Sequence, residues 1–297
     1  MRLLLQLALL TATAFAHPGI GIVVDQAGNV YYTDLKQVWR MDPRGVKTVV
    51  VPGVHTHELY LDAEGNLFGE HLWYTGPQDG SGTWHFRIWK RTPDGRVADV
   101  VPATDGFRKR VSLVRDSAGN MYAAGESEAE STRVSVRRID AQGRSTRLAR
   151  GGPAFADGTG AAAGFRDIRW MAVGADQKLY VVDGPALRRV NPATGTVTTL
   201  ARDLTEFTPN PLQWDSRHAL MGLTADAQGN VYVAHHQGGK VKKVGRDGQV
   251  TVFDRSSGKW SPTGVALAPN GDKAYILEYG GLFDVRVRVV TLTPARK

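Results

Sequence analysis

Three of the chain's eight histidines lie within one short stretch, HTHELYLDAEGNLFGEH, residues 55 to 71. His55 and His57 are two residues apart, so in an extended strand their side chains lie on the same side. Imidazole nitrogens bind zinc and copper, and histidine is also the commonest general base near neutral pH. The stretch predicts either a local metal site or solvated histidines that hydrogen-bond one another. The metal set that it offers is His55, His57, His71 and Glu58.

The turn within this stretch is repeated along the chain and indicates which elements must position the histidines. DAEGN begins at residue 62, and close copies are DQAGN at 25, DSAGN at 116 and DAQGN at 226. Short apolar runs flank each copy. Such runs around an Asp-x-x-Gly-Asn turn are typical of β-hairpins, because glycine adopts a positive φ and aspartate accepts hydrogen bonds from the turn.

Two weaker copies, at 171–183 and 264–278, bring the number of units to six, and a second hairpin follows in most of them. Six units over the roughly 281 residues after an N-terminal leader give about 47 residues each, the size of a propeller blade. The sequence therefore predicts an all-β, six-bladed β-propeller of four-stranded antiparallel blades in one domain, 17–297. The predicted blades are approximately 20–51, 55–102, 108–150, 167–201, 218–254 and 260–292, and the last is either three-stranded or completed by the chain ends.

Antiparallel partners lie at equal distances from their turn, which predicts the pairs at the open end of each hairpin. Counting five residues out from the turn pairs Ile20 with Asp34, His57 with His71, Arg169 with Asp183, Met221 with His235, and Thr263 with Glu278. We expect Asp34 and Asp183 to be structural, with Arg169 as a partner of Asp183. His57 and His71 would face each other, whereas His235 lies in the opposite blade. These last three are the candidate catalytic histidines.

Four longer segments are expected on one face of the ring: 72–84, 126–132, 151–165 and 203–217. Insertions on one face favour that face for binding. Aromatic side chains there would either stack on a flat ligand such as a sugar or bury their own loops. The predicted ligand-binding residues are Trp73, Trp84, Arg110, Arg169, Trp214 and Tyr279.

The N-terminal residues 1–16 are typical of a secretory signal peptide, with an apolar run from Leu3 to Leu10 and a small-residue cleavage site ending at Ala16. We expect a secreted or periplasmic protein. With no cysteine, the chain has neither a disulfide nor a thiolate metal site. The formal charge of +8 favours anionic neighbours, but nucleic acid is not expected outside the cytoplasm. We expect no transmembrane segment and a monomer.

The repeat, and especially residues 155–201 beginning FADGTGAAAGF, resembles the NHL-repeat and gluconolactonase-like (senescence-marker-type) propeller families. The resemblance implies the same fold, and in the gluconolactonase-like proteins a divalent cation, usually calcium, at the top of the channel. The matching acidic and Asn positions are absent here, so the expected cofactor stays open between calcium, zinc, copper and none. Two functions follow: an exported propeller binding a small-molecule, carbohydrate or protein ligand, or a metal-dependent hydrolase or lyase acting on a lactone or a similar substrate.

Overall fold

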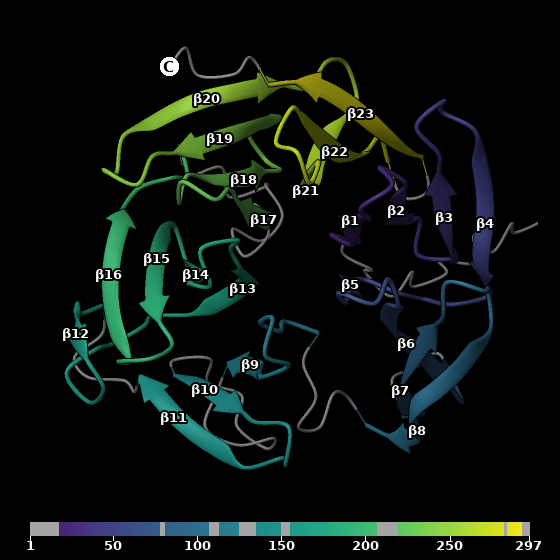
Figure 1. Cartoon of the computed structure of the whole chain (residues 1–297), viewed down its shortest axis with the longest axis horizontal. Coiled ribbons are helices and arrows are strands. Elements are labelled where there is room, and N and C mark those ends of the chain that lie inside the picture. The colour runs from purple at the N-terminus through teal and green to yellow at the C-terminus, as the bar shows by residue number, and fades with distance from the viewer. Residues whose placement is uncertain are drawn as a thin grey trace, which may run out of the picture.

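A computed structural model of the chain shows a ring of six antiparallel sheets around a central axis (Figure 1). The structure describes residues 18–77, 81–106, 113–124, 135–149, 155–206, 219–281 and 284–292. Over these ranges the chain forms strands and turns and no helix. Hence no helix that could cross a membrane occurs in the described part. The predicted leader lies outside it.

The first three sheets follow one another along the chain as blades 1 to 3. Blade 1 contains β1 (Ile22–Val24), β2 (Val30–Thr33), β3 (Gln37–Met41) and β4 (Lys47–Pro52). Blade 2 contains β5 (Leu59–Leu61), β6 (Leu67–Thr75), β7 (Thr83–Arg91) and β8 (Val97–Asp105). Blade 3 contains β9 (Met121–Ala124), β10 (Val136–Ile139) and β11 (Ser145–Ala149), and a single bridge from Arg115 to Met121 stands in for its inner strand.

Blades 4 to 6 complete the ring. Blade 4 contains β12 (Gly158–Thr159), β13 (Ile168–Val173), β14 (Leu179–Asp183), β15 (Ala186–Asn191) and β16 (Thr196–Ala201). Blade 5 contains β17 (Leu220–Ala225), β18 (Val231–His235), β19 (Lys240–Val244) and β20 (Val250–Arg255). Blade 6 contains β21 (Ser261–Leu267), β22 (Lys273–Tyr279) and β23 (Val285–Thr291). Of the two predicted forms of the last blade, the described residues show the three-stranded one.

The repeated turns have the expected construction. In the first, Asp25 accepts hydrogen bonds from the backbone amides of Ala27 and Asn29, and from the Asn29 side chain at 2.7 Å. Gly28 has a φ of 80°, which a residue without Cβ adopts without strain. The same aspartate-to-asparagine bonds recur at Asp62, Asp116 and Asp226.

Each seam between neighbouring blades contains its own hydrophobic cluster. Trp89 and Leu67 of blade 2 pack with Val38 of blade 1, and Val233 of blade 5 packs with Val182 of blade 4. The remaining seams contain clusters of the same kind. Burial of apolar surface, at about 25 cal/mol per Å², therefore stabilises the ring seam by seam, without disulfides.

Two of the expected loops have a different structure. Residues 72–75 and 83–84 continue β6 and β7, so the segment 72–84 is largely an extended hairpin, with Trp73 paired to His85 and Tyr74 to Trp84. In the segment 151–165, β12 pairs with the outer edge of β16 near the Gly195 turn. Where they are described, these segments are thus partly strand, and the expectation that the four segments share one face of the ring stays a prediction. Most of 126–132 and 203–217 lies outside the described residues.

Candidate functional site

The predicted register of the hairpins holds next to the turns, but in three blades the pairs at the open ends are shifted by one residue. In blades 4, 5 and 6 a bulge near the outer end of the first strand places Ile168 opposite Asp183, Leu220 opposite His235, and Pro262 opposite Glu278. The predicted partners Arg169, Met221 and Thr263 are each displaced. A bulge inserts one unpaired residue and turns the following side chains to new directions.

The blade 2 histidines do come together, but not as the facing pair that was expected. The His71 Nδ1 atom accepts a hydrogen bond from the backbone amide of His55 at 2.8 Å. The His55 and His57 rings contact edge to face, with centroids 4.6 Å apart. The His57 Nδ1 atom lies 3.5 Å from Glu70 Oε1. His71 therefore lies opposite His55, and Glu70 takes the place beside His57.

Burial changes the protonation of these imidazoles. It lowers the pKa of His71 to about 4, assisted by the Arg87 guanidinium. It also lowers the pKa of His55, with His57 as the second cause. His71 is therefore neutral at pH 7, and its Nδ1 acts as an acceptor.

The donors in this cluster do not fit a metal ion. One ring nitrogen of His71 is used by the backbone, and the Glu70 carboxylate accepts the amides of His57 and Glu58. Across the described ranges no three histidine, aspartate or glutamate side chains are placed to hold a metal. The set His55, His57, His71 and Glu58 thus gains no support as a metal site, whichever of calcium, zinc or copper is considered.

His235 lies in blade 5, on the other side of the ring from blade 2, as the register argument expected (Figure 1). It is 3% exposed, and its Nδ1 atom is buried without a hydrogen-bond partner in the part of the chain that the structure describes. Burial lowers its pKa to about 4, with Lys242 and Lys240 as the next causes. His57, His71 and His235 therefore do not share one catalytic centre.

The aromatic residues that were predicted to bind a ligand contact side chains of their own blade. The Trp73 indole stacks with the His71 ring at 4.9 Å and with the His85 ring at 5.0 Å between centroids. Trp84 contacts Tyr74 at 5.3 Å between centroids. Of the two predicted roles, these contacts favour burial of the aromatic surface within the extended hairpin.

The other predicted ligand-binding residues also have structural contacts where they are described. Arg169 forms an ion pair with Asp167 instead of the predicted Asp183. Tyr279 is 3% exposed and donates a hydrogen bond to the Thr33 carbonyl at 3.2 Å, which joins blade 6 to blade 1. Arg110 and Trp214 lie outside the described residues.

The aspartates at the ends of the second strands are structural, as predicted. Asp34 accepts the amides of Lys36 and Gln37. Asp183 accepts the amides of Arg166 and Asp167, both at 2.7 Å, and its other oxygen binds Arg188 at 2.9 Å.

Sequence reasoning considered Glu70 only as one of the acids that could complete a metal site, and it missed the amide-accepting role of Glu70 and the buried Arg188, although both had a signal. Glu70 is an acid at the position where the other units have Thr33, Ala124, Val182, Ala234 and Leu277. Arg188 is fully buried and contacts Asp183 and Asp157. A charged residue on the buried side of a predicted strand indicates a buried partner.

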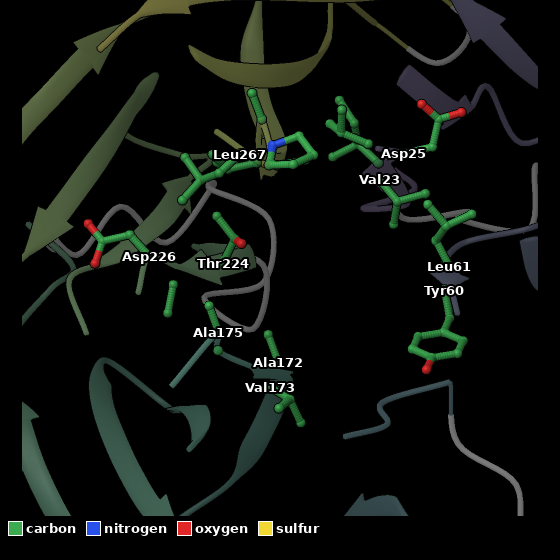
Figure 2. Close-up of a pocket in the computed structure, with 18 of the residues that line it drawn as sticks. Val23, Asp25, Tyr60, Leu61, Ala172, Val173, Ala175, Thr224, Asp226 and Leu267 are labelled. Atoms are coloured by element: carbon green, nitrogen blue, oxygen red, sulfur yellow. The ribbon is translucent and has the colours of Figure 1, made fainter. Parts of the chain in front are cut away.

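A cavity of about 1990 Å³ lies along the central channel. All six blades contribute to its wall, from Ile20 and Glu58 at one end to Asp226 and Asn270 at the other. Figure 2 shows Leu61, Val173 and Leu267 around an open centre, with the Tyr60 and Thr224 hydroxyl groups among them. The wall also includes charged residues such as Asp25, Asp116 and Asp226. Apolar side chains with convergent polar groups are typical of small-molecule sites.

The sequence matches no protein-family model and no curated protein. Several solved structures have a similar fold. A gluconolactonase from Xanthomonas campestris is 14% identical, with a TM-score of 0.58 over 91% of this chain and 86% of that one. The calcium-binding protein regucalcin from Agrobacterium tumefaciens is 17% identical, with a TM-score of 0.52 over 88% and 81%.

An auxiliary nutrient binding protein from Bacteroides thetaiotaomicron is 11% identical, with a TM-score of 0.58 over 92% of this chain and 69% of that one. At such identities the likeness concerns the fold and not the chemistry. The chain is a six-bladed β-propeller with the fold of gluconolactonase-like proteins.

Proposed function

We propose that this protein is an exported β-propeller that binds a small-molecule or carbohydrate ligand in its central channel. The observation that carries the proposal is the cavity of about 1990 Å³, to which all six blades contribute. Export is inferred from the apolar leader of residues 1–16.

The chemistry of the channel wall supports a ligand with both apolar and polar parts. Leu61, Val173 and Leu267 supply apolar surface, while the Tyr60 hydroxyl and the Arg115 guanidinium supply polar groups. Arg115 lies 6.0 Å from the centre of the Tyr60 ring. Ligand pockets usually measure about 300–1,000 Å³, so a ligand of ordinary size would occupy one section of the channel.

The metal-dependent hydrolase or lyase is not favoured by the geometry. Its three histidines lie in two separate blades. In blade 2, His71 accepts a backbone amide and the Glu70 beside His57 accepts another. In blade 5, His235 lies beside two lysines that lower its pKa. A useful measurement is the metal content of the purified protein after dialysis, together with its melting temperature in Zn²⁺, Cu²⁺ and Ca²⁺. Stoichiometric metal and a raised melting temperature would restore the metal hypothesis.

The role of the channel in binding is tested with a ligand screen and with variants that place a large side chain in it. We would screen sugars, lactones and hydroxy acids by thermal shift, and then measure the Kd of each hit by calorimetry. Thr224→Trp and Ala172→Trp add a large side chain to the channel wall (Figure 2). We expect each to weaken binding at least tenfold, because an indole would occupy volume that the ligand needs.

The matched control is Val250→Trp, which adds an indole on the outer strand β20, where Val250 is 40% exposed. This variant should bind like the original protein. Unchanged affinity in both channel variants, with the fold retained, would place the ligand elsewhere and refute the proposal.

A further inference from the structure

Blade 5 contains two buried lysines beside an unpartnered histidine, outside the central channel. Lys240 and Lys242 are each 5% exposed, and both lie on β19 with one residue between them, so their side chains share a face. His235 is the cross-strand neighbour of Lys240. Among the described residues, Glu206 is the one acid that pairs with either lysine.

Burying an ammonium group is costly unless an anion lies beside it. Here a single carboxylate serves two cations: Glu206 Oε2 lies 2.5 Å from Lys240 Nζ, and Oε1 lies 3.0 Å from Lys242 Nζ. His235 adds no negative charge, and its buried Nδ1 atom has no partner among the described residues. The described part of the cluster thus has an excess of positive charge.

Blade 4 shows how the same positions are arranged when the charges match. Lys242 of β19 lies at the position that Arg188 has in β15, counted back from the turn after each strand. His235, the last residue of β18, lies at the position that Asp183 has in β14. Arg188 and Asp183 form an ion pair at 2.9 Å in which both side chains are fully buried. In blade 5 an imidazole thus stands where blade 4 has the carboxylate that neutralises the cation.

Glu206 differs from Asp183 in its exposure. Its side chain is 61% exposed, while those of Lys240 and Lys242 are 7% and 6% exposed. The lysines are thus fixed within the blade, and the carboxylate reaches them from the chain between blades 4 and 5. This arrangement shows that an oxyanion can be held between the two ammonium groups while remaining open to solvent.

We propose that Lys240 and Lys242 form a binding site for the oxyanion group of a ligand, a carboxylate or a phosphate, that takes the place of Glu206. Each ammonium group donates a charge-assisted hydrogen bond to the anion. Gly238 permits this arrangement, since a Cβ there would lie 2.5 Å from His235 Nδ1 and 2.8 Å from Lys240 Cε. The site is independent of the channel, because none of these side chains lines the cavity.

The test uses the full mature protein, with inorganic phosphate and citrate as two separate probes in calorimetry at low ionic strength. Glu206→Gln removes the internal competitor, so we expect binding of at least one probe about tenfold or more tighter than in the original protein. Which probe gains affinity distinguishes a phosphate ligand from a carboxylate ligand. In the Glu206→Gln background, Lys242→Met should weaken that binding about tenfold or more, and Lys242→Arg should largely restore it.

The matched control is Lys47→Met in the same background. Lys47 is an exposed residue of β4 in blade 1, and it lines neither the proposed site nor the channel. This variant removes the same charge away from both sites, so binding should be retained. Melting temperatures check the fold, and Lys240→Met replaces Lys242→Met if the latter does not fold. The proposal is wrong if Glu206→Gln binds neither probe, or if Lys47→Met weakens binding as much as Lys242→Met.

Discussion

Asp183→Asn tests the idea that buried carboxylates hold the blades together. Asp183 and Arg188 are both fully buried, and Asp183 also accepts two backbone amides. Asparagine keeps the shape and still accepts the amides, but it leaves the Arg188 guanidinium without its buried counter-charge. Removing one partner of a buried ion pair costs about 3–5 kcal/mol, so we expect the free energy of unfolding to fall by about that amount.

The matched control is Asp34→Asn, at the corresponding position of blade 1. Asp34 accepts Lys36 and Gln37 amides and the Trp39 indole N–H, but no cation, and it is only partly buried. Its loss should cost about 1 kcal/mol. Urea unfolding at pH 7, followed by tryptophan fluorescence, measures both. Equal losses in the two variants would refute the reasoning. Arg188→Met in the Asp183→Asn background should recover part of the loss, because it removes a buried charge whose remaining partner, Asp157, is partly exposed.

Three further predictions concern other buried groups. His235 has a folded pKa of about 4 against about 6.5 unfolded, so the unfolded state binds more protons between these values. This group should lower stability by up to about 1.4 kcal/mol per pH unit as the pH falls from 6.5 to 5, and His71, whose pKa is also about 4, should add to the slope. His235→Gln should therefore reduce the pH dependence in urea titrations without abolishing it, and an unchanged slope would contradict the assignment to His235. Gly69→Ala places a Cβ 2.3 Å from Trp89 Cζ2, so overpacking should cost about 1–3 kcal/mol in the same assay, and a neutral result would mean that Trp89 moves freely. Tyr279→Phe removes the hydrogen bond to the Thr33 carbonyl and should cost about 1 kcal/mol, whereas an unchanged melting temperature would contradict a role in closing the ring.

The fold could be predicted from the sequence because its signals are local. The Asp-x-x-Gly-Asn turn needs a positive φ at glycine and a short carboxylate beside it, and both lie within five residues, as at Asp25 and Gly28. Four such turns, together with the two weaker copies at 171–183 and 264–278, are enough to count the six blades. The register of each hairpin follows from the same turn as far as the first bulge.

The candidate site was less predictable because its geometry depends on contacts between distant segments. A bulge displaced Arg169 from Asp183, and nothing in IRWMAV marks where the bulge falls. The His71 ring accepts the His55 amide, and the neighbouring Glu70 carboxylate accepts the amides of His57 and Glu58. Such arrangements depend on side-chain lengths across two strands, which hairpin counting does not include.

The burial of each partner distinguishes the structural ion pairs from the pair of Glu206 with Lys240 and Lys242, which an arriving anion can exchange. Asp183 and Glu278 are fully buried acids, and their cations Arg188, Arg286 and Arg288 are at most 32% exposed. An acid fixed in this way cannot leave without exposing unpaired charge in the interior. At Glu206 the order is reversed, since the cations are buried and the carboxylate is exposed. Folding has already removed water from the two lysine ammonium groups. An arriving oxyanion can therefore replace Glu206 without reorganising the blade.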